Sequence, residues 1–139
     1  MNKDLCRARQ MLEEGGYTCV LCCGEQTHTS TARGVRPLLE LLDSGSWAQF
    51  SAADKVVGKA TAFLYVLLQI RAVYTPVISE AALEVLSRHG IAVQYGLSVP
   101  AILNRRKSGF CPMETAVSGI DDPAEALEKI RATYLALNS

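Results

Sequence analysis

Residues suited to binding or acid–base chemistry gather at Asp54 and Lys55, with Lys59 four residues further on, just before an apolar run at residues 60–70. The apolar pattern predicts a central buried helix that starts at Asp54. Helix N-termini carry free N–H groups and partial positive charge, and they favour bound anions. The two lysines project from one side of such a helix, so the stretch predicts a phosphate or carboxylate site. The alternative is local: Ser51 and Asp54 fit a helix-capping pattern, with the lysines simply solvated.

A second set of candidates lies outside this stretch. Arg33 precedes a glycine in a loop, and Asn104 and Arg105 begin a basic loop. All three could reach an anion, although surface positions in water account for them equally well. Cys111 opens a helical turn, where a thiol can become a nucleophile, and Glu114 would be its neighbour. The competing interpretation of Cys111 is a small residue that fills the core.

Three cysteines, Cys19, Cys22 and Cys23, fall within a segment that reads as a strand. Side chains alternate between the faces of a strand, so Cys19 and Cys22 are predicted to point in opposite directions. This geometry argues against a metal chelate or a disulfide, and we expect buried small side chains with no metal site.

The remaining chain alternates between helical and extended patterns. An opening helix at 3–14 precedes a tight hairpin of strands at 18–23 and 26–30. The later elements are a helix after Pro37, an extended segment at 47–53, a strand at 72–74, a helix at 80–88, a strand at 91–95, a short helix at 98–103 and a closing helix capped by Asp122. Such βαβ order predicts an α/β fold whose parallel strands end beside helix N-termini at one rim, where ligands bind.

Size and charge limit the function classes. A chain of 139 residues suits one domain, 1–139, and its zero net charge predicts neither a nucleic-acid partner nor a membrane surface. The apolar run at 60–70 is too short to span a bilayer. Five cysteines without a secretory signal favour free thiols and a cytoplasmic location.

Four runs in order carry a resemblance to a known family. They are Arg33 to Leu42, Ala53 to Ala60, Val77 to Leu83 and Cys111 to Glu114. Together they resemble the domain-of-unknown-function 1893 family of small prokaryotic proteins, which is assigned a cytidine-deaminase-like fold. The resemblance implies a three-layer α/β/α sandwich with a mixed sheet, and it implies assembly into a homo-oligomer.

The resemblance also implies a site without zinc. Zinc deaminases carry H-x-E or C-x-E at one helix start and P-C-x-x-C at the next. Here Ala53-Asp54-Lys55 stands at the first position, and Val77 and Glu80 follow Pro76 where the cysteines would lie. The comparison therefore implies a deaminase-like scaffold that lacks the zinc motif, with Asp54, Lys55 and Glu80 near the former metal position.

Three functions remain open at this point. The first is binding of a nucleotide-like or other phosphorylated small molecule through Lys55, Lys59, Glu80, Arg33, Asn104, Arg105 and Glu114, with no further cofactor. The second is a metal-independent enzyme whose reactive group is Asp54 or, less favourably, Cys111. The third is a structural or interaction protein whose polar residues only cap helices.

Overall fold

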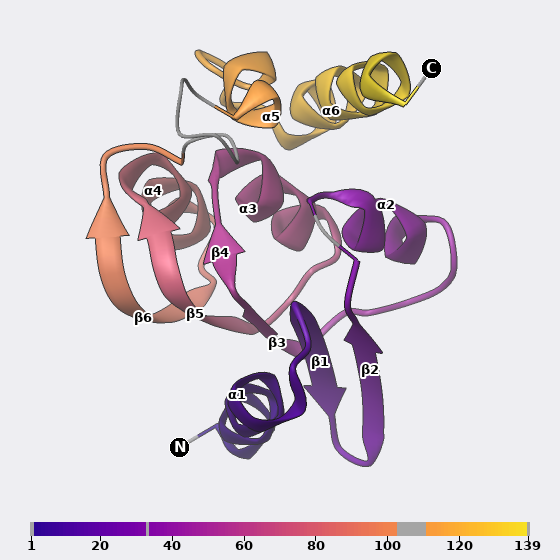
Figure 1. Cartoon of the computed structure of the whole chain (residues 1–139), viewed down its shortest axis with the longest axis vertical. Coiled ribbons are helices and arrows are strands. Elements are labelled where there is room, and N and C mark those ends of the chain that lie inside the picture. The colour runs from indigo at the N-terminus through magenta and orange to yellow at the C-terminus, as the bar shows by residue number, and fades with distance from the viewer. Residues whose placement is uncertain (1, 33, 103–110, 139) are drawn as a thin grey trace.

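The computed structural model describes residues 2–32, 34–102 and 111–138 (Figure 1). Within them the chain forms a mixed sheet of six strands and six helices. In order, the elements are α1 (Lys3–Gly15), β1 (Cys19–Cys23), β2 (Gln26–Ser30), α2 (Arg36–Leu42), β3 (Ser51–Asp54), β4 (Val56–Val57), α3 (Lys59–Leu67), β5 (Ala72–Ser79), α4 (Glu80–Arg88), β6 (Ala92–Val99), α5 (Pro112–Ala116) and α6 (Pro123–Leu137). None of the helices in the described ranges is long and apolar enough to cross a bilayer.

The sheet combines an antiparallel edge with a parallel half. β1 pairs antiparallel with β2 and β3, which confirms the predicted opening hairpin. β3, β4 and β6 all pair parallel with β5. β3 and β4 meet β5 one after the other, Ala53 opposite Tyr74 and then Val56 opposite Val77, with Lys55 between the two short strands. The predicted α/β class with a mixed sheet is therefore confirmed.

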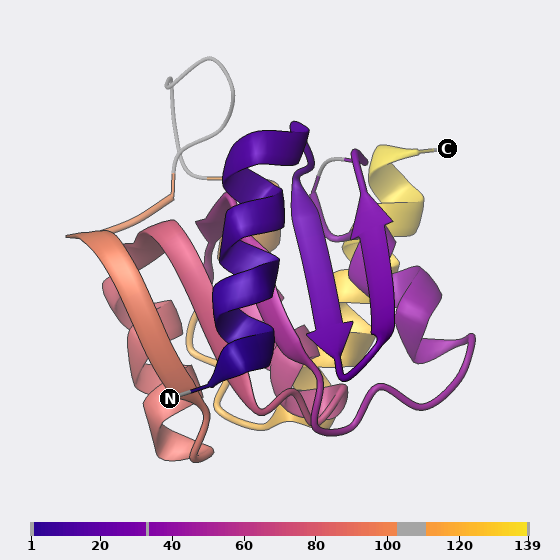
Figure 2. The ribbon, with the colours of Figure 1, turned by 90° about the horizontal axis from the view of Figure 1, so that it is seen from below.

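Helices cover both faces of the sheet. α1 covers one face, where Leu5, Ala8 and Leu12 pack against the strands (Figure 2). The other face carries α2, α3 and α4, and α5 and α6 lie beyond them as an outer layer (Figure 1). The face-alternation prediction is confirmed, because Cys19 belongs to the large core under α3 whereas Cys22 belongs to the small core under α1.

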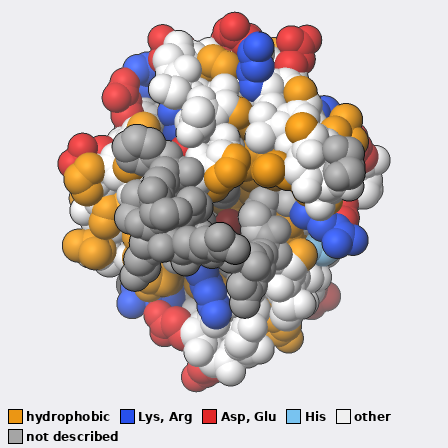
Figure 3. Space-filling view, turned by 45° about the horizontal axis from the view of Figure 1, so that its top comes forward, with side chains coloured by type: hydrophobic (Ala, Val, Ile, Leu, Met, Phe, Trp, Pro, Cys, Tyr) orange, Lys and Arg blue, Asp and Glu red, His pale blue; other side chains and the backbone are white. Residues whose placement is uncertain are grey.

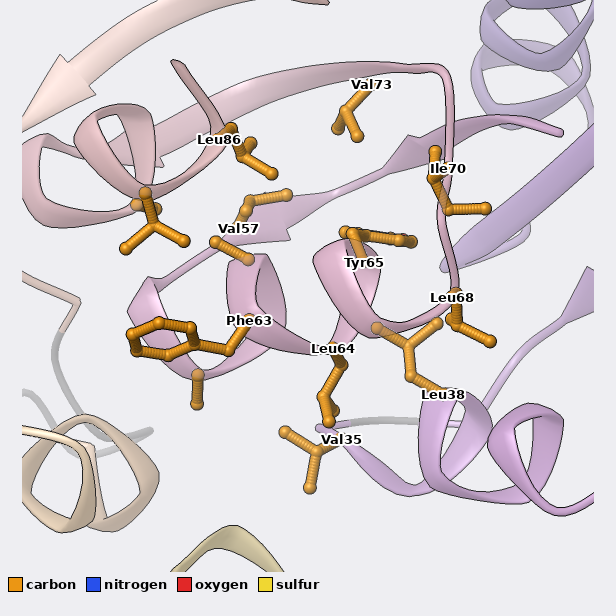
Figure 4. Packing of buried hydrophobic residues seen from close by; sticks show 14 of the residues in the cluster. Val35, Leu38, Val57, Phe63, Leu64, Tyr65, Leu68, Ile70, Val73 and Leu86 are labelled. Atoms are coloured by element: carbon orange, nitrogen blue, oxygen red, sulfur yellow. The ribbon is translucent and has the colours of Figure 1, made fainter. Parts of the chain in front are cut away.

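Helix α3 is the central buried helix that the apolar run predicts. Its side chains Phe63, Leu64 and Tyr65 are fully buried. Figure 4 shows them surrounded by Leu38 of α2, Leu86 of α4 and residues of the sheet. A helix with most of its residues buried must be enclosed by neighbouring elements, and α3 therefore organises the layers on this face of the sheet.

The predicted start of this helix at Asp54 is wrong. Asp54 is the last residue of β3 and pairs with Cys19, and Val56 and Val57 remain extended because they pair with β5. The helix begins only at Lys59, after Gly58 with an extended backbone. The Ser51–Asp54 capping alternative is also wrong, since both residues belong to β3. Pairing with the neighbouring strands β1 and β5 outweighed the local helical pattern at these residues.

The C-terminal half shows the same effect of sheet pairing. β5 and β6 are eight residues each, longer than the predicted strands. The helix expected at 98–103 is wrong at its start, because Ser98 and Val99 pair with Ile78 and Ser79. The predicted Asp122 cap is confirmed, because Asp122 accepts a hydrogen bond from the Glu125 N–H at the start of α6. Ser79 caps α4 in the same way, by accepting a hydrogen bond from the Ala82 N–H.

Candidate functional site

A cavity of about 1000 Å³ opens on the side of the molecule that carries α5 and α6. Its walls come from the end of β3, the turn before α3, the start of α2, the start of α5 and the end of α6. Figure 3 shows this face hollowed beside hydrophobic side chains. Segments far apart in the sequence thus meet around one cavity. It lies at the rim of the sheet where β3, a strand parallel to β5, ends.

Asp54 lines this cavity from the end of β3. Its Oδ2 accepts a 2.7 Å hydrogen bond from the Tyr65 hydroxyl of α3. Burial raises the pKa of Asp54 from 3.8 to about 6, and hydrogen bonds from Tyr65 and from the backbone N–H groups of Val56 and Lys55 oppose that rise. A half-buried carboxyl group with such a pKa changes charge close to neutral pH.

Tyr65 connects Asp54 to a second group of the cavity wall. The Sγ of Cys19 lies 3.4 Å from the Tyr65 hydroxyl oxygen. Because the hydroxyl proton is donated to Asp54, the Cys19 thiol is the donor to Tyr65. Burial raises the pKa of the Cys19 thiol, and the nearby Asp54 charge raises it further, so Cys19 stays protonated at neutral pH. Thiol, phenol and carboxyl group form one hydrogen-bonded chain that ends at the cavity.

Neither Cys19 nor Tyr65 was predicted from the sequence as a site residue. One signal for Tyr65 was present: it carries a hydroxyl in the middle of an apolar helix, and a buried tyrosine hydroxyl needs a hydrogen-bond partner. The partner itself could not be found from sequence, because the bond to Asp54 depends on how α3 packs over β3.

Glu114 occupies the N-terminus of α3. Its two carboxylate oxygens accept hydrogen bonds from the backbone N–H groups of Lys59 at 2.6 Å and Ala60 at 3.0 Å. The predicted anion-binding helix end is thus filled by a carboxylate of the protein itself, brought in by α5. Gly58 makes this contact possible, because a Cβ at that position would lie 2.5 Å from Glu114 Oε1.

The structure brings four of the predicted site residues to the cavity. Asp54, Lys55, Cys111 and Glu114 all line it. Lys55 is exposed, and Cys111 is half-buried at the N-cap of α5. The two predicted reactive groups, Asp54 and Cys111, therefore line the same cavity. The predicted helical turn after Cys111 is confirmed.

The other predicted residues lie elsewhere or outside the described chain. Glu80 is exposed at the start of α4 and is not part of the cavity wall. Lys59 also lies off that wall, with its Nζ 5.8 Å from the centre of the Phe63 ring. Arg33, Asn104 and Arg105 lie outside the described residues. Within the described ranges, no group of three or more His, Cys, Asp or Glu side chains is placed to hold a metal ion.

The fold and the site define a small mixed α/β protein with a half-buried carboxylate at the edge of a large cavity. Comparison with known sequences and structures assigns it further. The chain belongs to the family described as a domain of unknown function, DUF1893, whose sequence model matches residues 7–133. This confirms the family that the four sequence runs indicate.

A solved structure agrees with that assignment. The chain is similar to the crystal structure of a DUF1893 family protein, TM1506, from Thermotoga maritima, with a TM-score of 0.85 and 27% sequence identity. The match covers 98% of this chain and 92% of the Thermotoga chain. No curated protein matches the chain.

Proposed function

We propose that the protein binds a nucleotide-like or other phosphorylated small molecule in the cavity beside Asp54. The observation that carries the proposal is a half-buried carboxylate, held by Tyr65, on the wall of a space of about 1000 Å³. Small-molecule sites are typically clefts of this scale, largely apolar, with few polar groups that fix orientation. The pocket is proposed to be deaminase-like and metal-free, on a single domain in the cytoplasm.

The polar groups of the wall favour a ligand with two different ends. Asp54 accepts hydrogen bonds, so it suits the N–H edge of a base or an amine. Lys55 also lines the cavity and supplies positive charge for a phosphate, and Arg36, which pairs with Glu40 at 2.7 Å, lies on the same wall. A nucleotide carries both kinds of group. Glu114 already holds the first N–H groups of α3, so the proposed phosphate contact involves the side chains of Lys55 and Arg36 rather than that helix end.

Native mass spectrometry of the purified protein, followed by thermal shift with a panel of nucleosides, nucleoside phosphates and inorganic phosphate, tests this proposal. A nucleoside phosphate should raise the melting temperature of the wild type. Asp54→Asn should reduce the response to nucleosides and nucleotides, whereas Lys55→Ala should reduce only the response to phosphorylated compounds.

Glu128→Gln is the matched control, because Glu128 is exposed on α6 and lies off the cavity wall. It should respond as the wild type does. No shift with any compound would contradict the proposal and favour a structural role, whereas an equal shift in the Asp54 variant would contradict binding beside Asp54.

A second candidate function is a metal-independent enzyme. The pKa of Asp54 of about 6 favours it, because a carboxyl group that titrates near neutral pH suits general acid–base catalysis. Cys111 on the same wall is the alternative nucleophile. Turnover or a stable mass increase with a bound nucleotide, lost in Asp54→Asn but retained in Cys111→Ala, would assign the reaction to Asp54, and the reverse pattern would assign it to Cys111.

A further inference from the structure

The Tyr65 hydroxyl lies between a buried thiol and the carboxyl group of the cavity wall. Tyr65 and Cys19 are at most 3% exposed, and Tyr65 lies between α3 and the sheet (Figure 4). The Cys19 Sγ is 3.4 Å from the hydroxyl oxygen, which is 2.7 Å from Asp54 Oδ2. Tyr65 is not part of the cavity wall, whereas Asp54 is. Any effect of Tyr65 on a ligand therefore passes through Asp54.

These contacts give Asp54 a fixed direction of hydrogen bonding. Tyr65 donates its proton to Oδ2, and the backbone N–H groups of Val56 and Lys55, which can only donate, also favour the charged carboxylate. An ionised carboxylate is an acceptor only, with about four acceptor positions on its two oxygens. A ligand in the cavity must therefore bring a donor to Asp54 if it is to form a hydrogen bond there.

We propose that Tyr65 is a positioning residue that fixes Asp54 as an acceptor, so that the site selects ligands with an N–H donor over matched ligands without one. The inference rests on the proposed function, because it concerns the base end of a ligand in the same cavity. A ligand that lacks the donor leaves the charged carboxylate without a partner on the cavity side. It should therefore bind roughly tenfold or more weakly.

Acidification should remove this selectivity. Burial raises the pKa of Asp54 to about 6, so the carboxyl group is charged at pH 7.5 and mostly protonated at pH 5. A protonated carboxyl group has lost its charge and one acceptor position. The advantage of a ligand with an N–H donor should therefore fall by roughly tenfold between pH 7.5 and pH 5.

The other ionisable groups around Asp54 do not produce this pH dependence. Burial raises the pKa of the Cys19 thiol and of the Tyr65 phenol, so both stay protonated over this range. Tyr74 of the adjoining strand β5 belongs to the small core on the opposite face of the sheet. Among the described residues, the other charged or titratable side chains of the cavity wall are Arg36, Lys55, Cys111, Glu114 and Tyr134. Their effects on the shared parts of two matched ligands cancel in the ratio of the two affinities.

Isothermal titration calorimetry of the wild type with two matched pairs of nucleotides tests the proposal. Adenosine monophosphate is compared with purine riboside monophosphate, and cytidine monophosphate with its analogue that lacks the amino group. The members of a pair share the phosphate and the ring system, and the base of the analogue carries no N–H donor. In at least one pair the amino-bearing member should bind roughly tenfold or more tightly at pH 7.5, and most of that difference should be lost at pH 5.

Tyr65→Phe tests the positioning role, because it keeps the ring and removes the hydroxyl group. Asp54 should then take up its proton at a higher pH, so the selectivity should also be lost at a higher pH than in the wild type. Tyr95→Phe is the matched control, because Tyr95 is 46% exposed on β6 and lies off the cavity wall. It should keep the wild-type pH profile. Asp54→Asn, whose amide does not titrate, should make the ratio of affinities independent of pH.

The outcomes distinguish failure of this inference from failure of the proposed function. If no nucleotide binds, the proposed function is wrong and the inference is wrong with it. If nucleotides bind but both members of each pair bind equally at pH 7.5, binding stands and donor selection is wrong. A wild-type pH profile in Tyr65→Phe would show that the phenol does not position Asp54. Circular dichroism establishes that the variants fold, and the comparison of pairs needs the wild type alone.

Discussion

At the scale of single residues, the site contains a chain of three hydrogen-bonded side chains: a thiol, a phenol and a carboxyl group. Cys19 donates to Tyr65, Tyr65 donates to Asp54, and only the last of these has a pKa near neutral. Asp54 could be proposed from sequence because it was predicted at a helix start on the rim where the parallel strands end, and the structure places it on that rim at the end of β3 instead. The chain behind it could not, since it joins residues 46 and 11 positions apart that meet only after packing.

The raised pKa of Asp54 predicts how stability depends on pH. The folded state binds this proton more tightly than the unfolded chain, so the contribution is complete below pH 3.8 and is lost as pH rises through about 6. By pH 7 the loss reaches at most about 3 kcal/mol of unfolding free energy, from a shift of about two pKa units.

Asp54→Asn removes this titration, because the amide stays neutral. Urea unfolding of both proteins from pH 4 to pH 8 should show the variant gaining on the wild type as pH rises. Other acidic groups affect both proteins equally and cancel in the difference. A difference that stays constant across this range would show that Asp54 does not titrate there.

The Tyr65 hydroxyl lowers the pKa of Asp54, so its removal should have a measurable opposite effect. In Tyr65→Phe the pKa of Asp54 is expected to rise above its wild-type value of about 6. Carbon-13 NMR of the aspartate carboxyl groups during a pH titration measures it directly.

Tyr134→Phe is the control for that titration, because Tyr134 also lines the cavity, whereas the hydroxyl that donates to Asp54 is that of Tyr65. It should leave the pKa of Asp54 unchanged. An unchanged or lower value in Tyr65→Phe would mean that the phenol does not stabilise the charged carboxylate.

At the scale of elements, sequence patterns located caps and turns better than strand lengths. The hairpin, the Pro37 start of α2 and the Asp122 cap depend on residues within a few positions, and all are confirmed. The start of α3 was wrong because Asp54 and the following valines pair with strands that come from distant parts of the chain. Similarly, no local signal indicated that the residue completing the first turn of α3 would be Glu114, 55 positions from Lys59.

Glu114→Gln tests this long-range cap. The amide can accept a hydrogen bond with only one atom, and it carries no charge to complement the helix N-terminus. The substitution should lower the free energy of unfolding by about 1 kcal/mol, measured by urea denaturation.

Glu128→Gln, an exposed change of the same chemistry on α6, should have no comparable effect. Equal stability of the two variants would show that the Glu114 contacts to Lys59 and Ala60 contribute little.

At the scale of the whole molecule, the sheet divides the apolar residues into two unequal cores. The larger one lies under α2, α3 and α4, whereas the smaller one has α1 as its helical cover. The alternation of Cys19 and Cys22 predicted two buried faces from sequence. The same alternation did not indicate that α5 and α6 form an outer layer. That layer depends on their contacts with α3, which lies far from them in the sequence.

Because the smaller core lies beneath α1, shortening a buried side chain of α1 should lower the free energy of unfolding substantially. Leu12 is 4% exposed beneath that helix, and Leu12→Ala should lower the unfolding free energy by about 2–5 kcal/mol. Leu135→Ala, at an exposed position of α6, should change it by less than about 0.5 kcal/mol. Thermal and urea denaturation compare the two, and similar effects would mean that α1 is not an essential cover of the sheet.

The contact between Gly58 and Glu114 has a consequence for sequence variation among relatives. Because a Cβ at position 58 would collide with the carboxylate at position 114, the two positions are expected to covary. Relatives with alanine or a larger residue at 58 should carry a shorter side chain at 114, and libraries that randomise one position alone should recover mostly the parental pair.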